Sequence, residues 1–145
     1  MRLRHIYILL CFASLLNINN ALAESEGDAK EQSFHMGLMH PNGVDLAGYS
    51  VEKKFNNELS NNIYHFYNFG FPSLAATGFS FYENRNGNGF TATAGIGIGF
   101  VMYGSAAYQL KIDKNQFIKL GAGLGFGILH GGLFTVISYE HRFKD

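Results

Sequence analysis

Hydrophobic and polar positions alternate strictly through residues 89–100, GFTATAGIGIGF. The even positions carry apolar side chains: Phe90, Ala92, Ala94, Ile96, Ile98 and Phe100. The odd positions carry only glycine and threonine. A period of two is typical of a β-strand, because successive side chains point to opposite faces.

The same alternation extends from Ser33 to the end of the chain, interrupted by polar or glycine-containing turns. It predicts eight strands, the fifth within 89–100. The others are expected at 33–39, 44–53, 62–71, 74–83, 102–112, 116–128 and 135–143. Many short strands joined by short turns indicate an all-β fold, an antiparallel up-and-down barrel.

The parity of the apolar face tests this division. The apolar positions are odd in 74–83, even in the next three strands and odd in the last. A hairpin connection with an even number of residues switches this parity, and an odd number preserves it. The connections must therefore be even, odd, odd and even, and the sequence accommodates six, three, three and four residues.

The opposite face indicates which side of the wall meets the interior. Gly121, Gly123, Gly125 and Gly127 occupy it in 116–128, and no charged residue occurs in the 25 residues 86–110. Glycine on a solvent face would weaken a strand, whereas glycine inside a narrow barrel makes room for bulky neighbours. The apolar face is therefore expected to point outward into lipid, as in a transmembrane β-barrel. A secreted soluble β-barrel with an apolar core that binds a small apolar ligand is the alternative.

The start of the chain predicts export. Arg2 and Arg4 precede the uncharged run 6–16, and Ala21-Leu22-Ala23 fits a cleavage site, so 1–23 is interpreted as a signal peptide. A lipoprotein signal ending at Cys11 is the alternative. Residues 24–32 are expected to be a flexible polar lead-in, and 33–143 the barrel domain. Residues 24–145 contain no cysteine, and their 9 Lys+Arg and 11 Asp+Glu give a net charge of −2, which does not suggest nucleic-acid binding.

The last strand ends in Tyr139-Glu140-His141-Arg142-Phe143. This ending resembles the terminal strand of bacterial outer-membrane barrels, and 33–143 resembles the small eight-stranded proteins of that type. The resemblance implies a Gram-negative outer-membrane location, outer-membrane lipid as surroundings, and the barrel-assembly machinery as a partner that reads 135–143. The sequence departs from the pattern by adding Lys144-Asp145. A structural or surface-interaction role without catalysis is expected.

Candidate chemistry is sparse. The histidines His35, His40, His65, His130 and His141 lack metal-ligand spacing and are expected at interfaces or turns, so neither a metal nor another cofactor is predicted. Outer-membrane lipid A deacylases use a His-x-Ser pair, which this chain lacks. A lipid-modifying hydrolase would require Ser138 and Glu140 to meet His65. Otherwise Ser138, Glu140 and Arg142 are expected to form polar contacts that pair buried charge in the lumen.

Eight strands enclose a lumen just wide enough for side chains or one small ligand, so free conduction of solutes is not expected. The aromatic residues between Tyr64 and Phe81 are expected to help fill that lumen. The connections at the end opposite the termini are short, unlike the long outer loops of such barrels. This shortness indicates either a different strand count or an unusually low outer rim.

Overall fold

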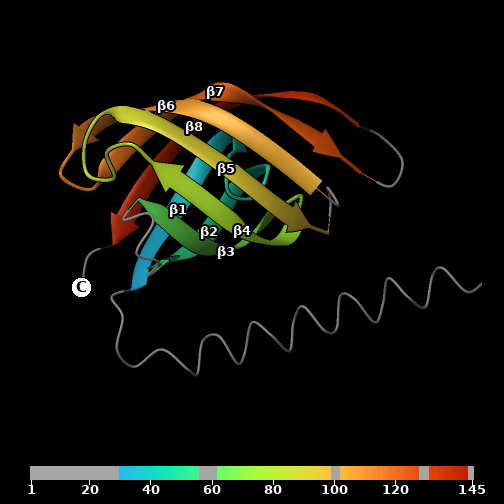
Figure 1. Cartoon of the computed structure of the whole chain (residues 1–145), viewed down its shortest axis with the longest axis horizontal. Helices are drawn as coiled ribbons and strands as arrows, with labels where there is room; N and C mark the ends of the chain where they lie inside the picture. The colour runs from blue at the N-terminus through green and yellow to red at the C-terminus, as the bar shows by residue number, and fades with distance from the viewer. Residues whose placement is uncertain (1–29, 56–61, 99–101, 128–130, 144–145) are drawn as a thin grey trace, which may run out of the picture.

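A computed structural model describes residues 30–55, 62–98, 102–127 and 131–143 (Figure 1). These residues form eight strands: β1 (Lys30–His40), β2 (Asp45–Lys54), β3 (Ile63–Phe71), β4 (Leu74–Tyr82), β5 (Gly89–Gly97), β6 (Met102–Asp113), β7 (Gln116–Phe126) and β8 (Gly131–Phe143). The predicted signal peptide, most of the lead-in and His130 lie outside the described residues. No helix in the described part is long and apolar enough to cross a membrane.

Each strand pairs antiparallel with the next, and β1 pairs with β8, which closes an up-and-down barrel. The predicted fold class is therefore confirmed. β1 begins at Lys30 rather than Ser33, because Lys30, Glu31 and Gln32 pair with the end of β2. The lead-in thus contributes three residues to the barrel wall. The other strands match their predicted ranges apart from a few residues at their ends.

The strand registers confirm the parity argument. Thr77 faces Ile96 between β4 and β5, so the parity of a face switches there. Ala106 pairs with Ala92 on β5 and with Ala122 on β7, so the parity is preserved across β5, β6 and β7. Leu120 pairs with Ile137, and the parity switches again. The parity of the apolar face therefore switches, stays, stays and switches as predicted, although four residues separate β5 from β6 and two separate β6 from β7, where the register shifts between Lys111 and Asp113.

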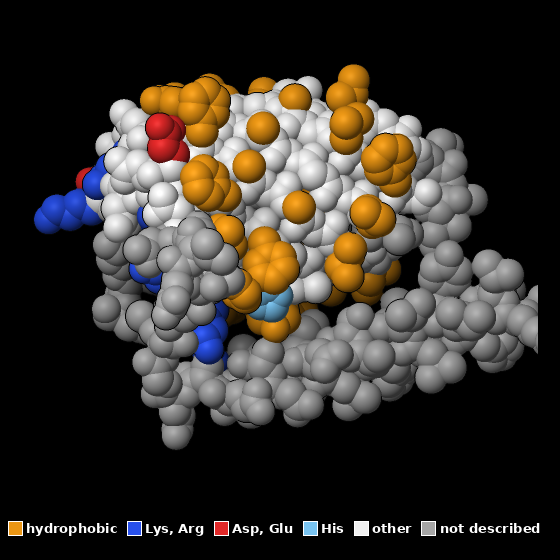
Figure 2. Space-filling model, viewed as in Figure 1, with side chains coloured by type: hydrophobic (Ala, Val, Ile, Leu, Met, Phe, Trp, Pro, Cys, Tyr) orange, Lys and Arg blue, Asp and Glu red, His pale blue; other side chains and the backbone are white. Residues whose placement is uncertain are grey.

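The apolar face points outward, and hydrophobic side chains are spread over the wall (Figure 2). Most of the aromatic side chains expected in the lumen are on this outer surface: Phe69, Phe71, Phe79 and Phe81 are exposed. Only Phe66 in that segment is fully buried. The expectation that aromatic residues fill the lumen was therefore wrong. The register of β3 and β4 places their odd positions outward, and these four exposed phenyl rings occupy odd positions, whereas Phe66 occupies an even one.

Inside the barrel, a small apolar cluster lies near the end opposite the termini. Its buried members are Val44, Phe66, Ala76 and Tyr103, with Met39 and Phe134 packed against them. Most of the remaining buried side chains are polar or charged. The interior is thus a polar network with one apolar layer, and it lacks the extended apolar core of a soluble barrel.

Gly121 provides a test of how tightly the wall is packed. A Cβ at this position would lie 2.1 Å from the Ala106 carbonyl oxygen and 2.5 Å from the Ala107 Cα, and both are backbone atoms that cannot rotate away. Gly121→Ala is expected to lower the free energy of unfolding by about 1–3 kcal/mol. At Gly132 nothing lies within 4 Å, so Gly132→Ala should change it by less than about 0.5 kcal/mol. Urea denaturation of both variants would check this, and equal midpoints would contradict it.

Candidate functional site

The lumen holds six buried charged side chains within the described residues. Three are acidic and three are basic: Asp45, Glu52, Glu140, Arg85, Lys119 and Arg142. Lys119 lies on β7 three residues after its start, is 1% exposed and points inward. The equal numbers leave no net charge in the interior from these groups, which lowers the cost of removing them from water.

Glu140 forms ion pairs with two basic side chains, those of Lys119 and Arg142. Its Oε2 lies 2.6 Å from Lys119 Nζ, and its Oε1 accepts a hydrogen bond of 2.8 Å from Arg142 Nε. The predicted pairing of Glu140 with Arg142 in the lumen is confirmed. Ser138, the third residue of that prediction, is buried, but its hydroxyl has no hydrogen-bond partner. The parity of β8 therefore predicted the direction of all three side chains but not all their contacts.

Tyr82 and Glu52 connect the acidic and basic groups across the lumen. The Tyr82 hydroxyl donates to Glu52 Oε1 at 2.8 Å and accepts from Lys119 Nζ at 3.3 Å. Arg85 pairs with the other oxygen of Glu52 and, at 2.7 Å, with Glu31. Arg85 also lies 4.3 Å above the Tyr82 ring, a cation–π contact. Burial lowers the pKa of Arg85, but Glu52 and other acidic neighbours more than offset this, so it stays above its ordinary value.

The connection between β4 and β5 covers the lumen at the end that bears the termini. Gln109 Nε2 donates to three carbonyl oxygens of this connection, those of Asn84, Arg85 and Gly87. Arg142 Nη1 donates to the same Arg85 carbonyl, and Arg142 Nη2 donates to Gln109 Oε1 at 2.6 Å. Interior side chains of β6 and β8 therefore hold this connection across the opening.

The turn between β1 and β2 enters the lumen from the opposite end. Asn42 is fully buried, and its amide donates to Glu52 Oε1 at 2.5 Å and accepts from Ser80 Oγ at 3.1 Å. Met39, just before the turn, and Val44, its last residue, each have a φ of 57°, a backbone conformation that residues other than glycine rarely adopt. This inward-folded turn, residues 40–44, is called the plug below.

The plug offers a prediction of moderate size. Tyr103 donates its hydroxyl to the Asn42 carbonyl at 2.7 Å, which anchors the plug to β6. Tyr103→Phe removes one buried hydrogen bond and should cost about 0.5–1.5 kcal/mol. The backbone amides of Gly43 and Val44 should then exchange with solvent faster, whereas those of β7 should not. Amide hydrogen exchange would measure this, and unchanged exchange in the plug would contradict the anchoring role.

Two histidines were missed as interior residues. The rings of His35 and His40 stack at 3.8 Å between centroids, and both are fully buried. Asp45 lies 3.9 Å from His35, and Glu140 lies 3.7 Å from His40. His35 faces inward because β1 presents its odd positions to the lumen, and His40 follows because the chain bends into the plug. The expectation that the histidines lie at interfaces or turns was wrong for His35, which lies within β1, whereas His40 does lie at the turn between β1 and β2.

The residues considered for hydrolysis do not assemble. His65 lies on the outer face of β3, where Nε2 is 3.2 Å from Thr77 Oγ1 and the ring contacts Tyr67. Ser138 and Glu140 point into the lumen, so the strand wall separates them from His65. Among the described residues, no group of three or more histidine, cysteine, aspartate or glutamate side chains could hold a metal ion.

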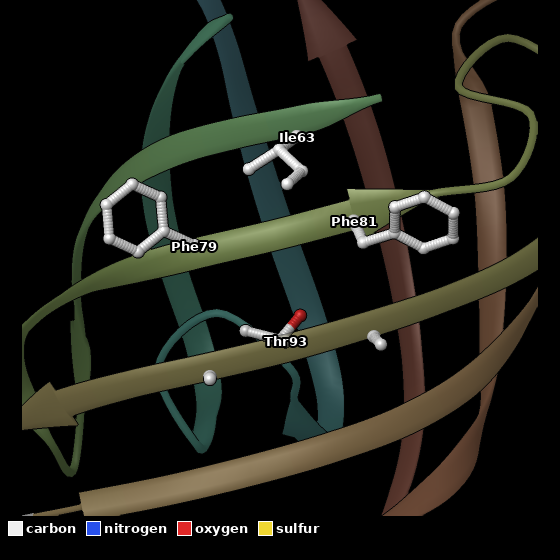
Figure 3. A pocket seen from close by; sticks show the side chains of 6 residues that line it. Ile63, Phe79, Phe81 and Thr93 are labelled. Atoms are coloured by element: carbon white, nitrogen blue, oxygen red, sulfur yellow. The ribbon is translucent and has the colours of Figure 1, made fainter. Parts of the chain in front are cut away.

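The outer wall has a shallow apolar hollow of about 230 Å³ over β3, β4 and β5 (Figure 3). It is lined by Ile63, Phe79, Phe81, Ala92, Thr93 and Ala94. The small alanine side chains of β5 lie beside the large phenyl rings of β4, and this difference in size creates the depression. The hollow lies on the outer wall and is separate from the buried polar network of the lumen.

No protein family, curated protein or solved structure matches the chain. The functional argument therefore depends on the closed barrel, its exposed apolar wall and its filled lumen.

Proposed function

We propose that the protein is a small β-barrel integral to a bacterial outer membrane, with a structural or surface-interaction role and no catalytic activity. The observation that carries this proposal is the distribution of side chains across the barrel wall, which is the opposite of that in a soluble protein. Large hydrophobic side chains are exposed while charged side chains are buried. In water, this arrangement would expose a large apolar surface and bury charges at considerable cost. In lipid, the exposed side chains have an apolar environment, and the closed barrel leaves no unpaired strand edge.

The dimensions of the strands support this location. The strands contain 9–13 residues, and a transmembrane strand needs about 9–11 when tilted. On the outer wall, the residues with small side chains lie among larger ones, and the hollow beside Phe79 and Phe81 has the apolar lining that suits a lipid acyl chain. Outer-membrane lipid and, during assembly, the barrel-assembly machinery are the partners that this proposal includes.

The lumen argues for a structural role over transport. The connection between β4 and β5, which Gln109 binds, covers one end of the lumen. The plug enters from the other end, and ion pairs occupy the space between them. A solute would have to displace these contacts. A secreted barrel with an apolar ligand in its lumen is disfavoured, because such a ligand would meet Lys119, Glu140 and Arg142.

The test is fractionation of the producing bacterium, followed by gel electrophoresis of unheated and boiled samples. The protein should be recovered with the outer-membrane fraction and migrate differently in the two lanes, because a closed barrel in lipid resists detergent until heated. Recovery in the soluble periplasm or the medium, without a heat-dependent shift, would overturn the proposal.

A further inference from the structure

The two ends of the barrel differ in charge. Exposed charged side chains occur at the end that bears the termini, among them Lys54, Glu83, Lys111, Asp113 and Lys114. Among the described residues, the half of the barrel toward the opposite end comprises 36–48, 69–80, 93–98, 102–106, 121–127 and 131–137, and these contain one acidic or basic residue besides histidine, Asp45. Asp45 is fully buried. Figure 2 shows the same asymmetry, with the charged side chains gathered near the end where the C-terminus lies.

Large apolar side chains are prominent at this uncharged end. Leu133 is 80% exposed, the highest value among the large hydrophobic residues described. Other strongly exposed apolar residues of this end are Phe71, Leu74, Met102 and Phe126. We call these five residues the apolar rim. Within the described residues, it continues the apolar outer wall without an intervening band of charged side chains, whereas a barrel end that meets water normally carries polar loops.

Three backbone N–H groups of the described residues at this end are bonded within the protein. The Ser73 N–H donates to Asp45 Oδ1 at 3.0 Å, and the Ile98 N–H donates to the Ala75 carbonyl at 3.1 Å. The Val44 N–H donates to the His40 carbonyl at 2.8 Å inside the plug. The buried Asp45 thus accepts a hydrogen bond from the turn between β3 and β4. The three N–H groups have partners within the protein and do not need water as an acceptor. Such internal bonding is what a turn near hydrocarbon requires.

We propose that the apolar rim is immersed among lipid acyl chains, so that this end of the barrel does not project into water. The inference rests on the proposed membrane location and refines it. The occupant of the rim is the lipid hydrocarbon, since the rim is continuous with the wall that faces the same lipid. The surface that remains available to a protein partner is consequently the end that bears the termini. We call its exposed charged residues Lys54, Glu83, Lys111, Asp113 and Lys114 the charged rim. The short connections at the other end therefore correspond to a low outer rim, because the strand count is eight.

The experiment uses single cysteines, because residues 24–145 contain none. Leu133→Cys reports on the apolar rim, Ala106→Cys on the middle of the outer wall, and Lys114→Cys on the charged rim. Each variant is labelled with a small fluorophore and reconstituted in phosphatidylethanolamine–phosphatidylglycerol vesicles that contain lipids brominated on the acyl chain. The fluorophores at 133 and 106 should be quenched several-fold more than the one at 114.

A second readout is the labelling of the unmodified variants in vesicles by a water-soluble maleimide. Leu133→Cys should react at least about tenfold more slowly than Lys114→Cys. Ile112→Cys is the matched control, because Ile112 is also an exposed apolar residue, 56% accessible, but lies beside the charged turn. It should react like Lys114→Cys. A heat-dependent gel shift of each variant establishes that the barrel has formed.

The outcomes separate the two proposals. Quenching at 106 without quenching at 133 would overturn the immersion of the rim and leave the membrane location standing. Absence of quenching at both positions would overturn the membrane location itself. A cysteine at 133 that is neither quenched nor reactive would show that protein covers the rim, and this result would also overturn lipid as its occupant.

Discussion

Glu140→Gln is expected to destabilise the barrel by about 3–5 kcal/mol, since it removes one member of a buried charge network and leaves the others in place. Lys119 would lose its partner at 2.6 Å, and Arg142 would lose the charge of a partner at 2.8 Å. The interior would then hold one uncompensated positive charge. The effect is measured as the change in the midpoint of urea unfolding. Unfolding is monitored by the loss of the heat-dependent gel shift.

Two controls give this prediction its specificity. Asp113→Asn removes an acidic charge at the exposed turn after β6, where the change should stay within about 0.5 kcal/mol. The double variant Lys119→Met/Glu140→Gln restores the charge balance and should be less destabilised than Glu140→Gln alone. An unfolding midpoint of Glu140→Gln equal to that of the native protein would contradict the role assigned to this carboxylate.

Ala106→Arg is expected to cost about 2–4 kcal/mol if the outer wall faces the middle of a bilayer. Ala106 is exposed in the middle of β6, and its cross-strand neighbours on both sides are the alanines Ala92 and Ala122. No acidic side chain shares this row to pair with a guanidinium. In a soluble barrel, the same arginine would extend into water and change the stability by less than about 0.5 kcal/mol.

The matched control is Ala106→Leu, which adds a side chain of considerable size without charge and should be tolerated in lipid. Unfolding of the three proteins in vesicles, compared at equal lipid concentration, gives the difference. If arginine and leucine at position 106 give the same midpoint, the wall does not face hydrocarbon, and the soluble alternative regains support.

The fold was predictable because a strand pattern is local. The alternation of residues 89–100 shows which side chains share a face, and the parity of consecutive hairpins carries that assignment from strand to strand. The inward direction of Ser138, Glu140 and Arg142 followed from the same reasoning. The boundary of β1 did not, because Lys30, Glu31 and Gln32 are polar and become strand through pairing with β2, to which Gln32 adds a pair with Phe143 of β8.

The contacts in the lumen could not be predicted from periodicity. Arg85 pairs with Glu31, which is 54 residues away in the sequence. No sequence pattern links two residues at that separation, so the pair could not be predicted. Their meeting depends on how the closed sheet staggers its strands and on the path of the connection after β4. The wrong expectation for the aromatic residues had a different cause, because Phe79 and Phe81 occupy the odd, apolar face that the parity argument already places outward.

The sequence by itself determined that the chain alternates with a period of two, divides into eight strands and places its apolar face outward. Only the tertiary structure decided how the buried charges pair across the lumen and how both of its ends are covered. The plug illustrates the reason. Met39 and Val44 are not residues that favour a positive φ, so no local preference predicts the turn that brings His40 and Asn42 inside. That backbone is maintained by distant partners on β2, β4 and β6, and these contacts exist only once the barrel has closed.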